Sequence, residues 1–255
     1  PALHVVGKDI LRFHSVYWPA FLMAADLEPP SRVFAHGWWT NEGEKISKSL
    51  GNVIDPYEIV TKYGLDQIRF FLFREVPFGN DGDFSKDAIA QRLNADLSNN
   101  YGNLVQRICS FVKKNCDSKI FNNFDNNEDD NILLKSSIKR LINYKKYMNN
   151  QEIDKALKEV FLLLNEANIY VDKQAPWNLK KTNIERMNSV LSILIEIIKR
   201  IAIMTYPIMP NKSELLLKYL KYNIDNISFL DIEKLPQKEF VIDKPEPLFP
   251  KYEKI

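Results

Sequence analysis

The chain opens with short apolar runs that flank a helical pattern. Residues 3–6 form a β-branched apolar run of the kind that suits a buried strand. After a turn at residues 7–9, apolar side chains recur at helical spacing, and Pro19 is expected to kink or restart that helix. Residues 32–39 alternate loosely between apolar and polar side chains, which predicts a second strand.

A turn, a basic loop and two short helices are expected next. Residues 41–44 carry a turn signal, and the basic segment at residues 45–49 follows directly. Asp55 is a candidate N-cap because Pro56 can occupy the first helical position. The elements that the pattern predicts here are helices at 56–63 and 66–75 and a Gly/Asp-rich loop at 78–84.

Helical periodicity dominates after residue 85. Ser85 is expected to cap a long helix that runs from residue 87 to about residue 114. The polar stretch at residues 122–131 predicts a solvated loop. Further amphipathic helices are expected at 131–149, 151–172, 183–206 and 211–222, and the proline-rich segment from residue 227 to 255 is expected to lie extended along the surface.

These patterns predict a mainly α fold in which an α/β region precedes an antiparallel helix bundle. We place the α/β region at residues 1–85, the bundle at 86–225 and an extended tail at 226–255. The division rests on the change from short apolar runs and glycines to long amphipathic segments.

Composition excludes several classes of protein. Hydrophobic residues make up 45% and charged residues 27% of 255, which argues against a disordered chain. The net charge of +2 does not predict a strongly basic face, although RNA can be recognised at loops by stacking and hydrogen bonds. Cys109 and Cys116 are too few for a four-thiolate zinc site, so two reduced thiols and no metal are expected. The chain has no run of eighteen apolar residues, so we expect a cytoplasmic location and no membrane partner.

The segment KISKS at residues 45–49, called the KISKS loop below, carries the most specific chemistry. Its two lysines flank a serine in a glycine-bounded loop after a strand, and such loops can close over a ligand. Lysine ammonium groups suit phosphate oxygens and can stabilise charge that develops on a departing pyrophosphate. A solvated basic loop is the alternative for any such pentamer taken alone.

Several segments in order along the chain resemble one enzyme family. The KISKS loop resembles the KMSKS signature of class I aminoacyl-tRNA synthetases, with Ile46 in place of methionine. The other resembling segments are GKD at 7–9, FAHGWW at 34–39, GNVIDPYEIVTKYGLDQIRFFL at 51–72, NADLSNNYGNLVQR at 94–107 and DKQAPW at 172–177. Together they resemble bacterial-type methionyl-tRNA synthetases. The resemblance implies the end of a Rossmann-like α/β catalytic domain followed by a helical anticodon-binding domain.

The resemblance also implies roles for residues near the nucleotide. Lys48, assisted by Lys45, would bind the ATP phosphates as the catalytic pair, and Ser47 and Ser49 would add donors. Gly7 and Asp9 would lie near the ribose, His36 near the nucleotide, and the backbone around Trp38 and Trp39 beside the adenine. Each has an alternative: Asp9 can cap the helix that starts there, and the sequence does not decide which tryptophan ring is buried.

The resemblance places the amino-acid and tRNA sites on helices. Phe13 and His14 would line the methionine pocket, where an aromatic ring suits a thioether, although such a pair alone reads as core. Asn103 and Arg107, which are four residues apart and share a helix face, would bind anticodon bases. Trp177 would stack on another base, although alone it would read as a packing residue.

The implied activity is ATP-dependent joining of methionine to tRNA-Met, with Mg²⁺ accompanying the ATP. The family's His-Ile-Gly-His signature is not in this sequence. We therefore expect a C-terminal portion that is inactive alone, with any zinc confined to an upstream insert. Two alternatives remain open at this point: a class I synthetase for another aliphatic amino acid, and a non-catalytic tRNA-binding module.

Overall fold

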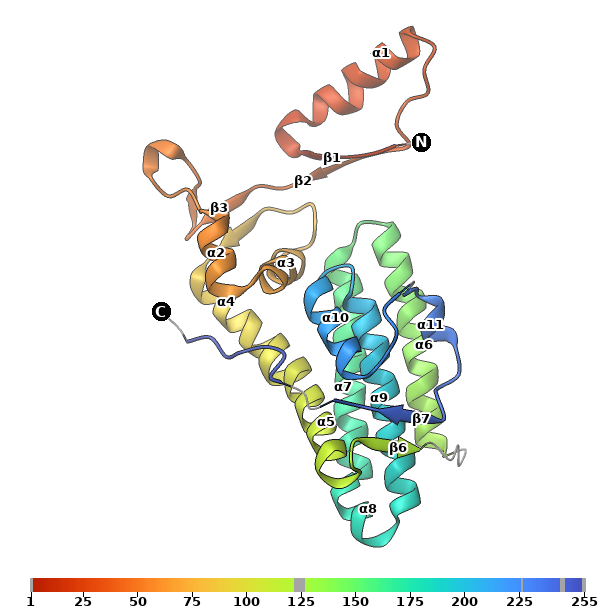
Figure 1. The fold of residues 1–255 in the computed structure, drawn as a ribbon. Coiled ribbons are helices and arrows are strands. Elements are labelled where there is room, and N and C mark those ends of the chain that lie inside the picture. Colours follow the sequence, from red (N-terminus) through yellow and green to blue (C-terminus); the bar gives the residue numbers. More distant parts are fainter. Residues whose placement is uncertain (1, 122–126, 226, 244–245, 254–255) are drawn as a thin grey trace.

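A computed structural model describes residues 2–121, 127–225, 227–243 and 246–253. Small sheets and short helices lie at one end, and one long helix joins them to a bundle (Figure 1). Helix α8 (Pro176–Thr182) lies at the opposite end of the molecule from α1 (Trp18–Ala24). The mainly α fold predicted from sequence is confirmed. In the part of the chain that is described, no helix combines the length and apolar character needed to cross a membrane.

Strands β1 (Leu3–Gly7) and β2 (Arg32–His36) form a parallel pair. The crossover between them is a 3-10 turn (Lys8–Ile10), a π-helical turn (Phe13–Tyr17) and α1. Pro19 lies in the first turn of α1, where the missing N–H costs no intrahelical hydrogen bond, so the helix restarts there as expected.

The prediction that the first strand is buried is wrong. Val6 is buried, but Leu3 and Val5 are 45% and 49% exposed. Within the described residues β1 pairs only with β2, and no other layer covers both faces of this sheet. An apolar run therefore predicted the strand correctly but not its surroundings.

A second sheet follows, in the order β4 (Glu44–Lys45), β3 (Trp39–Asn41), β5 (Gly82–Phe84). The predicted turn between β3 and β4 has positive φ at Glu42 and Gly43, which suits a tight hairpin. The prediction that 78–84 is all loop is wrong, because β5 pairs in parallel with β3, about forty residues earlier in the sequence. A Cβ at Gly82 would lie 2.9 Å from Cζ3 of Trp39, so the missing side chain makes room for that ring.

The two short helices lie as predicted. Helix α2 (Pro56–Tyr63) is capped by Asp55, whose Oδ1 accepts from Tyr57 N at 2.8 Å. Helix α3 (Leu65–Arg74) follows after Gly64. Its buried side joins the main core.

One uninterrupted helical stretch runs from residue 86 to residue 115. It begins with α4 (Lys86–Arg92), capped by the Ser85 hydroxyl as predicted. The middle, Leu93–Gly102, is π-helical rather than regular α-helix, which the sequence pattern did not predict. Helix α5 (Asn103–Asn115) completes it.

Four helices form the bundle: α6 (Glu128–Asn149), α7 (Ile153–Gln174), α9 (Ile184–Thr205) and α10 (Pro210–Tyr219). Residues 122–126 of the predicted loop lie outside the described residues, and α6 begins three residues earlier than expected because Asn127 caps it. Helix α8 was not predicted. It forms because Ala175 turns the chain through a left-handed conformation and Pro176 starts a new helix.

The segment after residue 226 is only partly extended. It contains a helical turn, α11 (Leu230–Glu233), and a strand, β7 (Glu239–Val241), that pairs antiparallel with β6 (Lys119–Phe121). Beyond them, Asn94 exchanges two hydrogen bonds with the backbone of Tyr252.

An ion cluster is buried on the central helix α9. Glu196 is fully buried and contacts Lys199 at 2.7 Å and the Nε of Arg200 at 2.8 Å. The same guanidinium donates to Ser137 Oγ of α6 at 2.6 Å. It also donates to the Lys234 carbonyl at 3.1 Å, so one arginine connects three segments.

Glu196→Ala is expected to lower the free energy of unfolding by about 3–5 kcal/mol, because it leaves buried cations without their carboxylate. Urea unfolding followed by circular dichroism measures this change. The matched control is Glu214→Ala, which removes a solvent-exposed i,i+4 pair with Lys218 and should cost about 1 kcal/mol or less. Equal losses in the two variants would contradict the prediction.

Candidate functional site

The parallel strands bring the predicted ribose residues together. Gly7 and His36 are register partners at the carboxyl ends of β1 and β2, where α/β folds commonly bind ligands. A Cβ at Gly7 would lie 2.5 Å from Asp9 Oδ1 and 3.9 Å from His36 Cε1. The three residues therefore form one cluster, and any side chain at position 7 would displace the carboxylate.

His36 is oriented by its own backbone. Its Nδ1 donates to the Gly37 carbonyl at 2.9 Å, because a carbonyl can only accept. In the neutral ring, Nε2 is then left as an acceptor. Gly37 is itself constrained, since a Cβ there would lie 2.2 Å from the Asn80 carbonyl oxygen.

Trp39 is the more buried of the two tryptophans. Trp39 packs inward against Phe71 and Phe84, with ring centroids 6.1 and 6.4 Å away. Trp38 is 52% exposed, and the Lys8 ammonium lies 4.3 Å from its ring centroid. Trp39 is only partly buried and also borders a hollow of about 340 Å³ that His36 and Gly37 line. Its place near the adenine stays a prediction.

Asp81 holds this segment in place, and sequence reasoning missed it. Its carboxylate accepts from Trp38 N at 2.8 Å and from Lys8 Nζ at 2.6 Å. The Lys8 hydrogen bond is the main cause that lowers the pKa of Asp81, with the Trp38 N–H adding to it. No local signal could have found Asp81, because its partners lie about forty and seventy residues away in the sequence.

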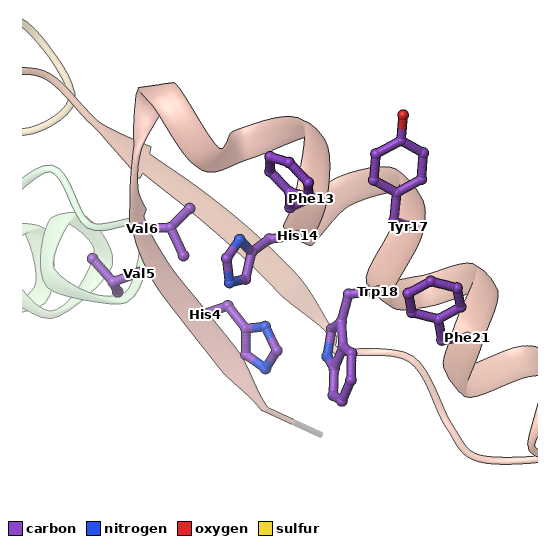
Figure 2. Close-up of a pocket in the computed structure, with 8 residues that line it drawn as sticks. All are labelled: His4, Val5, Val6, Phe13, His14, Tyr17, Trp18 and Phe21. Carbon is purple, nitrogen blue, oxygen red and sulfur yellow. The ribbon is translucent and has the colours of Figure 1, made fainter.

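Phe13 and His14 line a hollow of about 600 Å³ between β1 and the helical crossover (Figure 2). His14 donates from Nδ1 to the Ile10 carbonyl at 3.0 Å, which fixes its ring. Its ring lies edge-on to that of His4, with centroids 6.2 Å apart. The lining residues that sequence reasoning missed are His4, Val5, Val6, Tyr17, Trp18 and Phe21.

Some of the residues that line the hollow could have been predicted from helical spacing. Tyr17 and Trp18 are four residues after Phe13 and His14, so helical spacing alone could have added them. His4 could be assigned to the hollow only from the tertiary structure, because it lies on β1 whereas Phe13 and His14 lie on the crossover. Phe13 is 59% exposed, so the pair is not the core that its residue types suggest in isolation.

The KISKS loop is held by the side chain of Asn52. Its Oδ1 accepts from Ser47 N at 2.9 Å, and its Nδ2 donates to the Lys45 carbonyl at 3.0 Å. The hydroxyls of Ser47 and Ser49 lie 2.6 Å apart, so they partner each other. Gly51 closes the loop with a φ of +67°, a conformation that favours glycine.

Both lysines of the loop are available to a ligand. Lys45 and Lys48 are exposed, and across the described part of the chain neither ammonium forms an ion pair. No recorded contact joins them to the Gly7–Asp9–His36 cluster. The structure thus assembles the strand-end residues but leaves the loop lysines apart from them.

The predicted anticodon residues lie at the bundle end of the long helix. The Arg107 guanidinium lies 5.9 Å from the Trp177 ring, and its Nη2 donates to Asp172 at 3.0 Å. Arg107 and Trp177 border one hollow of about 220 Å³. Asn103 is exposed one turn earlier and borders another hollow, beside Phe249. Two of the three residues are therefore in contact, and the third continues the same helix face.

The described residues contain no cluster of potential metal ligands. Over residues 2–121, 127–225, 227–243 and 246–253, no three His, Cys, Asp or Glu side chains are grouped so that they could hold an ion. Cys109 and Cys116 are free, and burial raises the pKa of the Cys109 thiol to about 12.

Family models match both parts of the chain. A model described as tRNA synthetases class I (M) matches residues 1–109, and a model described as the anticodon binding domain of methionyl tRNA ligase matches residues 122–253. The chain belongs to the methionyl-tRNA synthetase family. This membership confirms the predicted class I catalytic region followed by a helical anticodon-binding domain.

Similar proteins agree with this assignment to the methionyl-tRNA synthetase family. Methionine–tRNA ligase of Brucella suis is 47% identical over 250 residues, which are 98% of this chain and 48% of the relative. That of Rickettsia felis is 50% identical over 224 residues, 87% of this chain and 44% of the relative. The chain thus spans about half the length of the curated relatives it matches.

A solved structure is similar in fold as well. Mycobacterium tuberculosis methionyl-tRNA synthetase in complex with methionyl-adenylate superposes with a TM-score of 0.93 at 40% identity. The match covers 97% of this chain and 50% of that one. The arrangement of the strand ends, the long helix and the bundle is therefore shared with a methionyl-tRNA synthetase.

Lys8→Met is expected to return the pKa of Asp81 toward its ordinary value, because the variant removes the main hydrogen bond to the carboxylate. A lowered pKa in the folded state means that the Lys8–Asp81 pair is intact above the usual carboxyl range and is lost as pH falls through the lowered value. An NMR titration of the side-chain carboxyl measures the change. Lys86→Met serves as the control, and an Asp81 titration that is the same in all three proteins would rule out the assigned cause.

Proposed function

We propose that this chain is part of an ATP-dependent methionine–tRNA ligase, with the site residues acting as the family resemblance implies. The observation that carries the proposal is the position of the apolar hollow at Phe13 and His14 beside the cluster of Gly7, Asp9 and His36 on one pair of strands. An apolar hollow for a thioether beside a carboxylate for a ribose is what joining methionine to adenylate requires. The similar Mycobacterium tuberculosis structure is named as a methionyl-adenylate complex.

In the proposed reaction, the carboxylate oxygen of methionine forms a bond to the α-phosphorus of ATP. The bond from that phosphorus to the bridging oxygen breaks, and pyrophosphate leaves with the electron pair. Asp9 would accept hydrogen bonds from the ribose hydroxyls, and Gly7 would let the sugar approach the backbone. The methionyl group would then pass to the terminal adenosine of tRNA-Met.

The exposed lysines of the KISKS loop would contribute positive charge to this reaction. Lys48 and Lys45 have no carboxylate partner in the described residues, so their charge is available for phosphate oxygens. The Asn52 clamp keeps the loop backbone in shape while both side chains stay free. Charge placed where pyrophosphate departs stabilises the transition state more than the ground state.

Lys48→Ala in the full-length protein is expected to lower the rate of methionine-dependent pyrophosphate exchange about 100-fold or more, with a much smaller effect on methionine affinity. The reason is that the lysine meets charge that develops only as pyrophosphate leaves. Lys86→Ala, another exposed lysine, is the control and should exchange near the wild-type rate. Exchange at wild-type rate in the Lys48 variant would refute the role.

At the other end of the molecule, Arg107, Asn103 and Trp177 would recognise the CAU anticodon. Guanidinium and amide groups suit base edges, and the exposed indole suits stacking on an unpaired base. The Arg107–Trp177 contact supports the proposal because it places a donor beside a stacking surface.

Trp177→Ala is expected to weaken binding of tRNA-Met by about 5- to 150-fold, the equivalent of about 1–3 kcal/mol of lost stacking. Charging of tRNA should fall far more than tRNA-independent pyrophosphate exchange. Ile142→Ala, which removes another exposed apolar side chain of the bundle, is the control. Similar losses in charging and in exchange would mean that Trp177 is structural.

A substrate panel separates the remaining alternatives. Pyrophosphate exchange by the full-length protein with methionine, isoleucine, leucine and valine tests the specificity, and exchange with none of them would indicate a tRNA-binding module. Mg²⁺ with the ATP, a cytoplasmic location and the boundaries at residues 85 and 225 stay predictions. Zinc has no candidate ligand group among the described residues of this chain, so no step is assigned to it.

A further inference from the structure

The face of α5 that carries Asn103 and Arg107 also carries a lysine near the end of the helix. Lys114 is seven residues after Arg107, so it lies on the same side of the helix two turns further on. Lys113 and Lys114 are both exposed in the last turn of α5. The face therefore changes along its length from groups that suit bases to a group that suits phosphate.

Helix α8 shows the same succession. Trp177 lies in its first turn, and Lys180 and Lys181 are three and four residues later, which places them on the side of the helix that carries the indole. Both lysines are exposed. A stacking surface is again followed by positive charge.

Two contacts join these faces, one at each end. Arg107 lies over the Trp177 ring at 5.9 Å, and Lys180 Nζ donates to Asn115 Oδ1 at 2.8 Å. The second contact holds the Lys180 ammonium beside Asn115, the last residue of α5, which follows Lys114 in the sequence. It uses a neutral amide, so the charge of Lys180 is not cancelled.

Carboxylates near this surface leave a positive excess. Asp172 pairs with Arg107, and Asp117 and Glu185 lie at the nearby helix ends. In the described residues, none of the lysines at 113, 114, 180 and 181 forms an ion pair. Lysines also favour helix C-termini through the backbone dipole, but the dipole does not require them to share a face with Arg107 and Trp177.

We propose that Lys114 and Lys180 bind backbone phosphates of the RNA nucleotides that flank the bases held at Arg107 and Trp177. The proposal rests on the proposed tRNA-binding function and adds a second class of contact to it. Phosphate contacts position the RNA without reading its sequence, whereas base contacts specify it. The two lysines would therefore set the affinity and register of the loop, and Arg107 and Trp177 its identity.

The double variant Lys114→Gln/Lys180→Gln in the full-length protein tests this. Binding to a stem–loop RNA with a CAU anticodon, and to the same RNA with a changed anticodon, is measured between 50 and 200 mM KCl. Each lost phosphate contact should reduce the slope of log affinity against log salt by about 0.7–0.9. Between 50 and 200 mM KCl, the affinity of the wild-type protein should therefore fall by a factor about ten times larger than the affinity of the double variant. The variant should weaken both RNAs by the same factor.

Three comparisons make the outcome decisive. Lys158→Gln removes an exposed lysine near the start of α7, about 24 Å along that helix from the end nearest α8, and should leave the slope unchanged. Thermal unfolding of each variant establishes that it is folded. Trp177→Ala should weaken the CAU RNA but keep the wild-type slope.

A wild-type slope in the double variant would overturn the phosphate sites while leaving the anticodon proposal intact. A loss confined to the CAU RNA would also overturn them, because it would mean base recognition. No binding of either RNA by the wild-type protein would overturn the proposed function itself, and the phosphate sites with it.

Discussion

The uninterrupted helix from residue 86 to residue 115 is the constraint on which the two candidate sites depend. Its thirty residues span about 40 Å, and its two ends carry different chemistry. The Ser85 cap begins it beside the strand that pairs with β3, and Arg107 and Lys114 lie near its other end. The helix therefore sets the distance between the proposed nucleotide site and the proposed RNA-binding surface. Contacts of α5 with the buried helix α9 hold this long helix against the bundle.

Hydrogen bonds of the segment near residue 252 also connect the N-terminal α/β region with the long helix. Tyr252 donates its hydroxyl to the Tyr63 carbonyl at 2.6 Å, and its backbone exchanges two hydrogen bonds with Asn94 in the π-helical stretch. Tyr252 therefore contacts both the long helix and α2, the helix that follows the KISKS loop. Arg69 of α3 adds a further tie by donating to the Ile208 carbonyl at 2.8 Å. Such ties restrict how far the KISKS loop and the bundle can move relative to each other.

The strand ends and the KISKS loop differ in how their lysines are partnered. Near the strand ends, Asp81 pairs with Lys8 and accepts from Trp38 N, which fixes the segment after β2, while Asp9 forms no ion pair among the described residues. In the KISKS loop, the backbone is held by Asn52 while both lysines are free of carboxylates among the described residues. The Lys8–Asp81 pair fixes the backbone near the proposed ribose site, and the charge of the loop lysines stays available for the proposed phosphate contacts. A loop built in this way can respond to a ligand at little cost.

The sequence by itself determined the elements with local signals: the Asp55 and Ser85 caps, the turn at Gly43, the helices of the bundle and the KISKS loop. Caps, turns and periodicity act within a few residues, so they can be read without a fold. It also supplied every predicted site residue, because those came from ordered motifs. Only the tertiary structure decided that Trp39 packs against the core while Trp38 is exposed, that residues 82–84 join a sheet and that Asp81 holds Lys8. These features depend on partners about thirty to seventy residues away. The free energy of such contacts comes from packing and pairing that no local pattern records.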